Sequence, residues 1–195
     1  MDWLSSLHLW EALGVALGLA YVLFAARESI WCWPCALVST TIFIFLFWEV
    51  NLLMESALNV YYLVMAIYGW WHWTRDKPDN KAKLPIQKWS ARKHGVTIFL
   101  IAVLTLLSGT LLNDRTSAAL PFLDSFTTWA AVITTWMVAL KVLENWLYWI
   151  VIDAASIILY VDRGLSMTAL LFALYVVIAA YGWWGWRQHY QQQEA

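Results

Sequence analysis

The hexapeptide YGWWHW at residues 68–73 returns almost unchanged as YGWWGW at residues 181–186. A shift of the chain by the same 113 positions brings further identical residues into register without a gap: Trp33 on Trp146, Met54 on Met167, Tyr62 on Tyr175, Gly69 on Gly182. A single aromatic hexapeptide carries little information, but a shared register over this length indicates duplication. We therefore predict that a three-helix unit occurs twice in this chain.

The composition is that of a membrane protein. Of the 195 residues, 62% are hydrophobic and 13% are charged, whereas about 25% are charged in a typical soluble domain. Seven apolar runs each come close to the ~20 residues that cross a bilayer as a helix: 9–26, 30–48, 52–73, 95–112, 125–142, 145–161 and 167–186. We predict an all-α protein with seven transmembrane helices in a lipid bilayer. The net charge of −1 gives no indication of a nucleic-acid partner.

The distribution of basic residues predicts the topology. With the N-terminus outside, 10 of the 12 Lys and Arg residues fall on the cytoplasmic side, in agreement with the positive-inside rule. The first repeat then covers residues 9–73, a basic cytoplasmic linker covers 74–94, the second repeat covers 123–186, and 187–195 form a cytoplasmic tail. The connecting helix at 95–112 restores the direction of the chain. This arrangement is a 3+1+3 parallel repeat, of the SWEET type.

The tryptophans of the two hexapeptides have a simple interpretation. Trp and Tyr concentrate at membrane interfaces. We therefore expect the rings of Trp71, Trp73, Trp184 and Trp186 to lie at the cytoplasmic interface.

An ionisable residue near the middle of a membrane helix is usually functional, and Asp153 is such a residue. Trp149, Asp153, Ser156 and Tyr160 follow one another in steps of four, three and four residues, which places them on one helix face. The alternative is that Asp153 only bonds a neighbouring helix.

A second polar stripe lies in the third apolar run. Glu55, Asn59 and Tyr62 share one helix face, and Tyr175 stands at the position of Tyr62 in the second copy. Together the two stripes offer a carboxylate, an amide, hydroxyls and aromatic faces. Such a set suits a flat aromatic cation, because aromatic rings attract cations and a carboxylate supplies the counter-charge.

The segment NWLYWIVIDAASIILYV at 145–161, the paired YGWW motifs, and Asn59 with Tyr62 resemble the PnuC family of bacterial vitamin transporters. Trp146 and Trp149, followed by a polar residue at 153, are the most specific part of the resemblance. It implies a multi-pass inner-membrane protein that assembles as a homotrimer. It also implies facilitated diffusion of a B-vitamin, trapped by cytoplasmic phosphorylation. Nicotinamide riboside members tend to carry Asn where this chain has Asp153, so thiamine is the expected substrate and nicotinamide riboside the alternative.

Other functions receive less support from the sequence. Asp153 and Glu55 could serve an intramembrane enzyme, but no nucleophile accompanies them, and we expect no catalytic residues. A membrane scaffold would not need polar stripes at the midplane. The C-x-x-C of Cys32 and Cys35 begins a membrane helix rather than a redox turn. No Gly-rich phosphate loop or metal-ligand spacing occurs, so we expect no cofactor and no metal.

Overall fold

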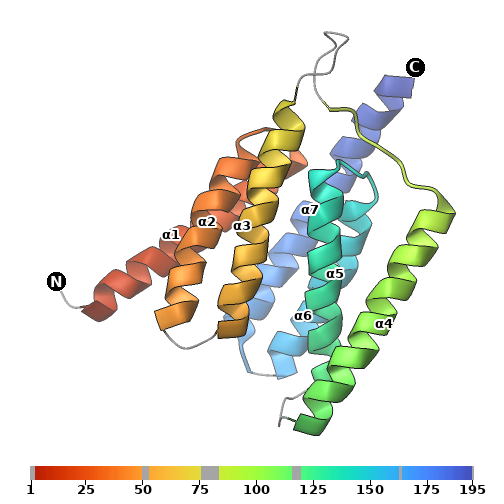
Figure 1. The fold of residues 1–195 in the computed structure, drawn as a ribbon. Helices are drawn as coiled ribbons and strands as arrows, with labels where there is room; N and C mark the ends of the chain where they lie inside the picture. Colours follow the sequence, from red (N-terminus) through yellow and green to blue (C-terminus); the bar gives the residue numbers. More distant parts are fainter. Residues whose placement is uncertain (1–2, 50–52, 76–83, 116–119, 163, 195) are drawn as a thin grey trace. The chain divides into compact units, whose positions relative to one another are not determined.

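The computed structural model describes residues 3–49, 53–75, 84–115, 120–162 and 164–194, and these residues form seven α-helices. The chain divides into two compact units, Met1–Pro85 and Ile86–Ala195. The first unit contains α1 (Trp3–Ala26), α2 (Cys32–Glu49) and α3 (Leu53–Thr74), and the second contains α4 (Ala91–Arg115), α5 (Pro121–Ala139), α6 (Asn145–Asp162) and α7 (Ser166–Glu194) (Figure 1). The prediction of an all-α chain with seven helices is confirmed.

Five of these helices, α1, α2, α4, α6 and α7, are long and apolar enough to cross a membrane. In the described residues, α3 and α5 fall short of that measure. The physical reason is their polar content: α3 carries Glu55 and Asn59, and α5 carries Asp124 and a series of threonines. Such side chains lower the mean hydropathy of a helix, and they are tolerated where neighbouring helices cover them.

In the first unit, α2 packs against both α1 and α3 (Figure 1). The buried Ser39 hydroxyl on α2 donates a hydrogen bond to the Gly14 carbonyl on α1, at 2.8 Å. Gly69 on α3 lies directly against the Trp33 indole, so that a Cβ atom there would overlap the ring. A small residue thus lets two membrane helices approach closely.

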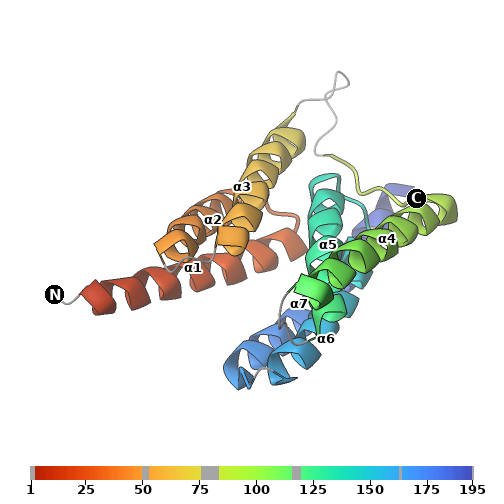
Figure 2. The same cartoon turned by 60° about the horizontal axis from the view of Figure 1, so that its bottom comes forward.

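In the second unit, each helix packs against the one that follows it, α4 on α5, α5 on α6 and α6 on α7 (Figure 2). The Trp129 indole of α5 donates to the Ser108 hydroxyl of α4 at 3.0 Å. A Cβ atom at Gly109 of α4 would lie 2.5 Å from the Phe122 ring of α5. α5 therefore has neighbours on two sides, which explains how it keeps its buried hydroxyl groups.

The helix boundaries of the two units correspond at an offset of 113 residues. α1 and α5 end at residues 26 and 139, α2 and α6 span 32–49 and 145–162, and α3 and α7 begin at 53 and 166. Glu28 and Lys141, also 113 residues apart, both have φ of 53° and follow the ends of α1 and α5. In both turns the next amide donates to the carbonyl five residues earlier, as in a Schellman motif: Ser29 to Phe24 at 2.9 Å and Val142 to Met137 at 3.0 Å.

The same aromatic packing also occurs in each unit. Trp33 meets Trp73 edge to face with ring centroids 5.2 Å apart, and Trp146 meets Trp186 in the same manner at 5.5 Å. A Cβ atom at Gly182 would lie 2.7 Å from the Trp146 ring, as at Gly69 in the first unit. These local agreements support the predicted duplication, while the parallel arrangement of the repeats stays a prediction.

Several boundaries differ from those expected. α5 ends at Ala139 rather than 142, because the left-handed Lys141 closes the turn. α7 continues to Glu194 rather than ending at 186, so the expected tail is helical, and the Tyr190 hydroxyl donates to the Glu194 carboxylate at 2.6 Å. α4 already begins at Ala91, within the stretch expected to be linker.

The predicted linker at 74–94 is only partly a linker. Residues 76–83 lie outside the described part of the chain, but Ile86 and Trp89 are buried in the second unit. The Gln87 amide donates to the Lys141 carbonyl at 2.8 Å, and the Leu143 amide donates to the Gln87 carbonyl at 2.7 Å. Burial of two large apolar side chains and this pairing with the α5–α6 turn fix the end of the segment.

Candidate functional site

Asp153 is the central polar residue of α6. It is only 4% exposed, and within the described residues its carboxylate accepts no hydrogen bond and forms no ion pair. The neighbouring Ser156 hydroxyl on the same face instead donates to the Ile152 carbonyl at 2.9 Å. An enclosed carboxylate without a donor is costly, so this group is suited to a ligand that brings a positive charge or a donor.

α7 provides the surface that faces Asp153. The Asp153 carboxylate lies near the Tyr175 phenol of α7. Phe172 meets Tyr175 edge to face at 5.7 Å between centroids and stacks on Tyr160 of α6 at 5.1 Å. The structure thus brings the predicted residues Asp153, Tyr160 and Tyr175 together at the contact of α6 with α7.

The two tryptophans of the W-x-x-W pattern have different surroundings. Trp149 is half-buried and packs against the cluster of Ile101, Ala130 and Ile152, on the side of α4 and α5. Trp146 is 2% exposed and packs against Gly182 and Trp186. Trp146 thus holds α6 against α7 at the end nearer the α5–α6 turn.

The second predicted stripe belongs to the first unit. Glu55 is exposed, Asn59 and Tyr62 are half-buried, and the Asn59 amide donates to the Glu55 carbonyl at 2.9 Å. Tyr62 lies near Tyr61 and Tyr21, with a centroid distance of 5.6 Å to Tyr61. These residues share one helix face as predicted, and one hydrogen bond of the Asn59 amide is already used within its own helix.

The expectation that all four hexapeptide tryptophans lie at the interface is wrong for two of them. Trp73 is 8% exposed and Trp186 is fully buried, because each packs edge to face against the tryptophan of the preceding helix. Trp71 and Trp184 are exposed, as interface residues would be.

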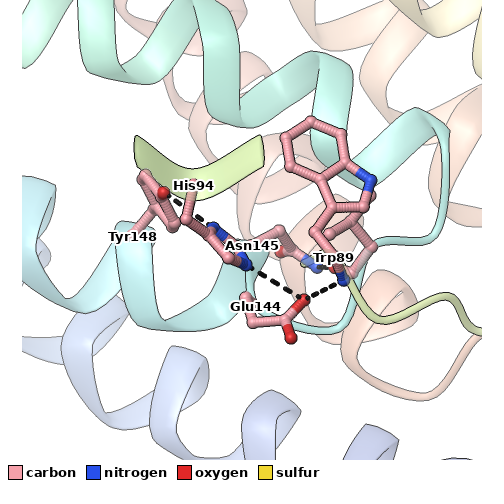
Figure 3. Close-up of polar contacts among 6 residues, drawn as sticks. Trp89, His94, Glu144, Asn145 and Tyr148 are labelled. Atoms are coloured by element: carbon pink, nitrogen blue, oxygen red, sulfur yellow. Dashed lines mark hydrogen bonds and ion pairs between the residues drawn. The ribbon is translucent and has the colours of Figure 1, made fainter. Parts of the chain in front are cut away.

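Sequence reasoning missed a polar network where the chain enters α4. The Glu144 carboxylate accepts the Trp89 backbone amide at 3.2 Å and lies 3.7 Å from His94 Nε2, while His94 Nδ1 meets the Tyr148 hydroxyl at 2.9 Å (Figure 3). Asn145 bonds the Val142 carbonyl at 2.6 Å beside them. The contacts of Glu144 and Tyr148 with Trp89 and His94 join residues 50 to 55 positions apart, so no local sequence pattern indicates them.

This network supports the start of α6. It fixes the α5–α6 turn between the end of α5 and the segment before α4, and Tyr148 packs on the same apolar cluster as Trp149. At the corresponding place in the first unit stands Trp31, which is 65% exposed. The second unit therefore has a polar network at this turn that the described residues of the first unit lack.

Seven helices, five of them suited to a membrane, with an enclosed carboxylate on one of them, are typical of a multi-pass membrane protein with a functional polar site. A family model described as "Nicotinamide mononucleotide transporter" matches residues 8–188. The chain belongs to this family, the PnuC family of vitamin transporters, and it is a multi-pass inner-membrane protein.

Individual relatives agree with this assignment. Over 197 residues the chain is 24% identical to the nicotinamide riboside transporter PnuC of Escherichia coli (strain K12), covering 88% of this chain and 82% of the relative. It is 25% identical over 200 residues to the riboflavin/roseoflavin transporter RibM of Streptomyces davaonensis, covering 94% and 92%. Its fold matches a crystal structure of the vitamin B3 transporter PnuC with a TM-score of 0.71 at 19% identity, covering 94% of this chain and 82% of that one.

The expectation of thiamine as the substrate receives no support. These relatives are named for nicotinamide riboside and riboflavin. The alternative expectation, nicotinamide riboside, fits the comparisons better.

Proposed function

We propose that this protein carries nicotinamide riboside across the inner membrane by facilitated diffusion, with phosphorylation in the cytoplasm trapping the solute. The named relatives favour this vitamin over thiamine, and the observation that supports a cationic solute is the enclosed Asp153 carboxylate, which lies near Tyr175 and has no donor among the described residues. Nicotinamide riboside is a pyridinium cation, whereas riboflavin is neutral. A cation resolves the cost of the enclosed carboxylate, and a neutral ring does not.

The aromatic residues around Asp153 support the same class of solute. Tyr175 lies near the acid and meets Phe172 edge to face, Tyr160 stacks on that same Phe172, and Trp149 lies one helical turn before Asp153. A cation over an aromatic face gains about 2 kcal/mol when it is desolvated. We assign the ring of the solute to Asp153, Tyr175 and Trp149, with Ser156 and Tyr160 beside it.

We assign supporting roles to the other residues of the predicted site. Trp146 positions α6 against α7 and so orients Asp153 and Trp149. Asn59, Tyr62 and Glu55 belong to the first unit, and their part in binding stays a prediction from the sequence. The exposure of Glu55 favours a role at an entrance rather than at the ring of the solute.

The wider arrangement is also part of the proposal. Matching turns, helix boundaries and Trp–Gly contacts support a 3+1+3 repeat, in which α4 is the connecting helix. We place the N-terminus outside and the C-terminus in the cytoplasm, on the basis of the basic residues. The homotrimer implied by the family resemblance stays a prediction.

A binding panel on the purified full-length protein tests the substrate. Nicotinamide riboside, thiamine and riboflavin are titrated while tryptophan fluorescence is recorded, since Trp149 lies at the proposed site. We expect saturable binding of nicotinamide riboside at lower concentration than of the other two. Tightest binding of riboflavin would exclude the charge-based proposal, and tightest binding of thiamine would keep the charge recognition but change the vitamin.

A further inference from the structure

The chain that enters α4 carries a cluster of exposed cations. Lys88 precedes the helix, and Arg92 and Lys93 lie in its first turn, with all three side chains exposed. Among the described residues, none of the three forms an ion pair, and Lys93 lies over the Trp89 ring with 5.7 Å between Nζ and the ring centroid. Basic residues are common in cytoplasmic loops, so the cluster alone does not identify a partner.

The segment that carries this cluster is held in place. Trp89 is buried, its backbone amide donates to the Glu144 carboxylate at 3.2 Å, and its ring meets that of Trp136 on α5 edge to face at 5.7 Å. The Glu144 carboxylate is engaged by this amide and by His94, at 3.7 Å, rather than by a cation of the cluster. Because the backbone is fixed here, a partner that binds the cations does not have to order a loose loop.

An apolar stripe begins at the cluster and continues along α4. Its residues follow Arg92 in steps of four, three, four and three, which places them on one face of the helix: Val96, Phe99, Val103 and Leu106. Val96, Phe99 and Leu106 are exposed. Within the described part of the second unit, α5 is the only helix that packs against α4, and the exposed stripe lies outside that contact.

Trp136 indicates the depth of the cluster in the membrane. Its ring is 44% exposed near the end of α5 and lies against Trp89, in the segment that carries the cations. Exposed tryptophan rings at the ends of membrane helices concentrate at the level of the lipid headgroups. α4 therefore has cations at headgroup depth and, from Val96 onward, apolar side chains at the depth of the acyl chains. A phospholipid has the same order of charge and hydrocarbon.

We propose that this surface binds an anionic phospholipid, with its phosphate at Lys88, Arg92 and Lys93 and its acyl chains along the stripe from Val96 to Leu106. Cations without a carboxylate partner favour a headgroup of net negative charge over a zwitterionic one. The apolar stripe favours a lipid over a soluble phosphate compound, because acyl chains remove apolar surface from water. The inference goes beyond the transport of the solute, and the proposed orientation determines only that the lipid belongs to the cytoplasmic leaflet.

Native mass spectrometry of the full-length protein in detergent tests this surface. The probes are phosphatidylglycerol and phosphatidylcholine with the same acyl chains, and the dissociation constant of the first bound lipid is measured for each. The cluster variant replaces its three cations: Lys88→Gln, Arg92→Gln and Lys93→Gln. The control variant removes the same number of exposed charges from the α1–α2 turn, the end of α3 and α7: Arg27→Gln, Arg75→Gln and Arg187→Gln.

We expect the parent protein to bind phosphatidylglycerol about tenfold more tightly than phosphatidylcholine, since each basic side chain near an anionic headgroup contributes about fivefold. The cluster variant should bind the two lipids within about twofold of each other, and the control variant should keep the preference of the parent. If the cluster variant does not fold, Arg92→Gln alone should lower the preference about fivefold. Equal binding of the two lipids by the parent, or equal losses in the cluster and control variants, would overturn the proposal.

Two further measurements distinguish a lipid from other occupants of this surface. Glycerophosphoglycerol, the headgroup of phosphatidylglycerol without its acyl chains, should not displace the lipid when added in excess; displacement would assign the cluster to a soluble anion and overturn the proposal. Phe99→Ala with Leu106→Ala should weaken the binding of both lipids several-fold and leave the mass of the assembly unchanged. A changed assembly mass with unchanged lipid affinity would assign the stripe to a second copy of the chain and would also overturn it.

Discussion

At the scale of single residues, the proposed recognition of a cationic solute depends on the charge of Asp153. An acidic side chain at the centre of a membrane helix costs about 2.5–3.5 kcal/mol on insertion scales. Asp153 is nevertheless enclosed, while the nearby Ser156 satisfies itself on its own helix. In the proposed function, a cationic solute bound near Tyr175 would offset the cost of an ionised carboxylate at this position.

Asp153→Asn tests this explanation, because it keeps the size of the side chain and one acceptor but removes the charge. A hydrogen bond to a charged group is worth about 1.5–3 kcal/mol, so the affinity for nicotinamide riboside should fall tenfold or more. Riboflavin binding should change much less, which makes it the matched neutral control. Titration of the purified variant measures both; unchanged or tighter binding of the riboside would show that the carboxylate does not recognise charge.

At the scale of elements, two pairs of helices are joined by a tryptophan packed on a glycine. The pairs are α2 with α3 and α6 with α7, and in each the glycine belongs to a repeated YGWW motif. No larger residue fits at Gly182 without movement of the Trp146 ring. The YGWW motif therefore serves mainly in helix packing, and its exposed residue Trp184 is the one suited to the membrane interface.

Gly182→Ala should destabilise the protein by about 1–2 kcal/mol, since overpacking costs about 1–3 kcal/mol and the higher helix propensity of alanine returns up to about 1 kcal/mol. Thermal unfolding in detergent is the measurement. Gly95→Ala is the control, because a Cβ atom there meets no neighbour within 4 Å. A lowered melting temperature for Gly95→Ala alone would contradict the packing explanation.

The turn between α5 and α6 is held by contacts of Glu144, and their contribution can be tested. Glu144 accepts the Trp89 amide and lies beside His94, so it joins the segment before α4 to the start of α6 (Figure 3). Glu144→Gln removes the charge and should cost about 1 kcal/mol, part of the value of a charged hydrogen bond. Hydrogen exchange at the Trp89 amide should become faster, with Lys88→Ala, at a neighbouring exposed residue, as the unaffected control. Unchanged exchange in Glu144→Gln would mean that this bond does not hold the segment.

Much of the fold and part of the candidate site could be predicted from the sequence, and the features that could not be predicted have physical reasons. The α6 stripe followed from a period of 3.6 residues, and the offset of 113 anticipated the matching turns after α1 and α5. The network of Glu144 with Trp89 and His94 could not be identified, because it joins residues at least 50 positions apart in the sequence. The buried position of Trp186 also escaped prediction, since composition alone cannot separate an aromatic ring in contact with a headgroup from one packed on another helix.

At the scale of the whole molecule, the topology is open to direct test. The basic residues predict that Ser90, which is exposed, lies on the cytoplasmic side. A Ser90→Cys variant, with Cys32 and Cys35 replaced by alanine, should resist an impermeant thiol reagent in intact cells and react after permeabilisation. Labelling in intact cells would reverse the proposed orientation.

The two units of the predicted duplication have similar local packing but different polar contents. Tyr21 and Trp31 of the first unit correspond to Thr134 and Glu144 of the second. If the predicted duplication holds, the packing is shared by the two units, while the enclosed acid belongs to the second unit. Two units that differ in polar content are compatible with a solute whose two ends differ chemically.

Flux through proteoliposomes tests the central claim most directly. Purified protein is reconstituted into vesicles loaded with unlabelled nicotinamide riboside, and labelled riboside is added outside without nucleotide or ion gradient. Facilitated diffusion predicts rapid transient accumulation of label in the vesicles, which Asp153→Asn reduces and protein-free vesicles do not show. Accumulation only in the presence of an ion gradient, or none at all while binding is retained, would contradict the account.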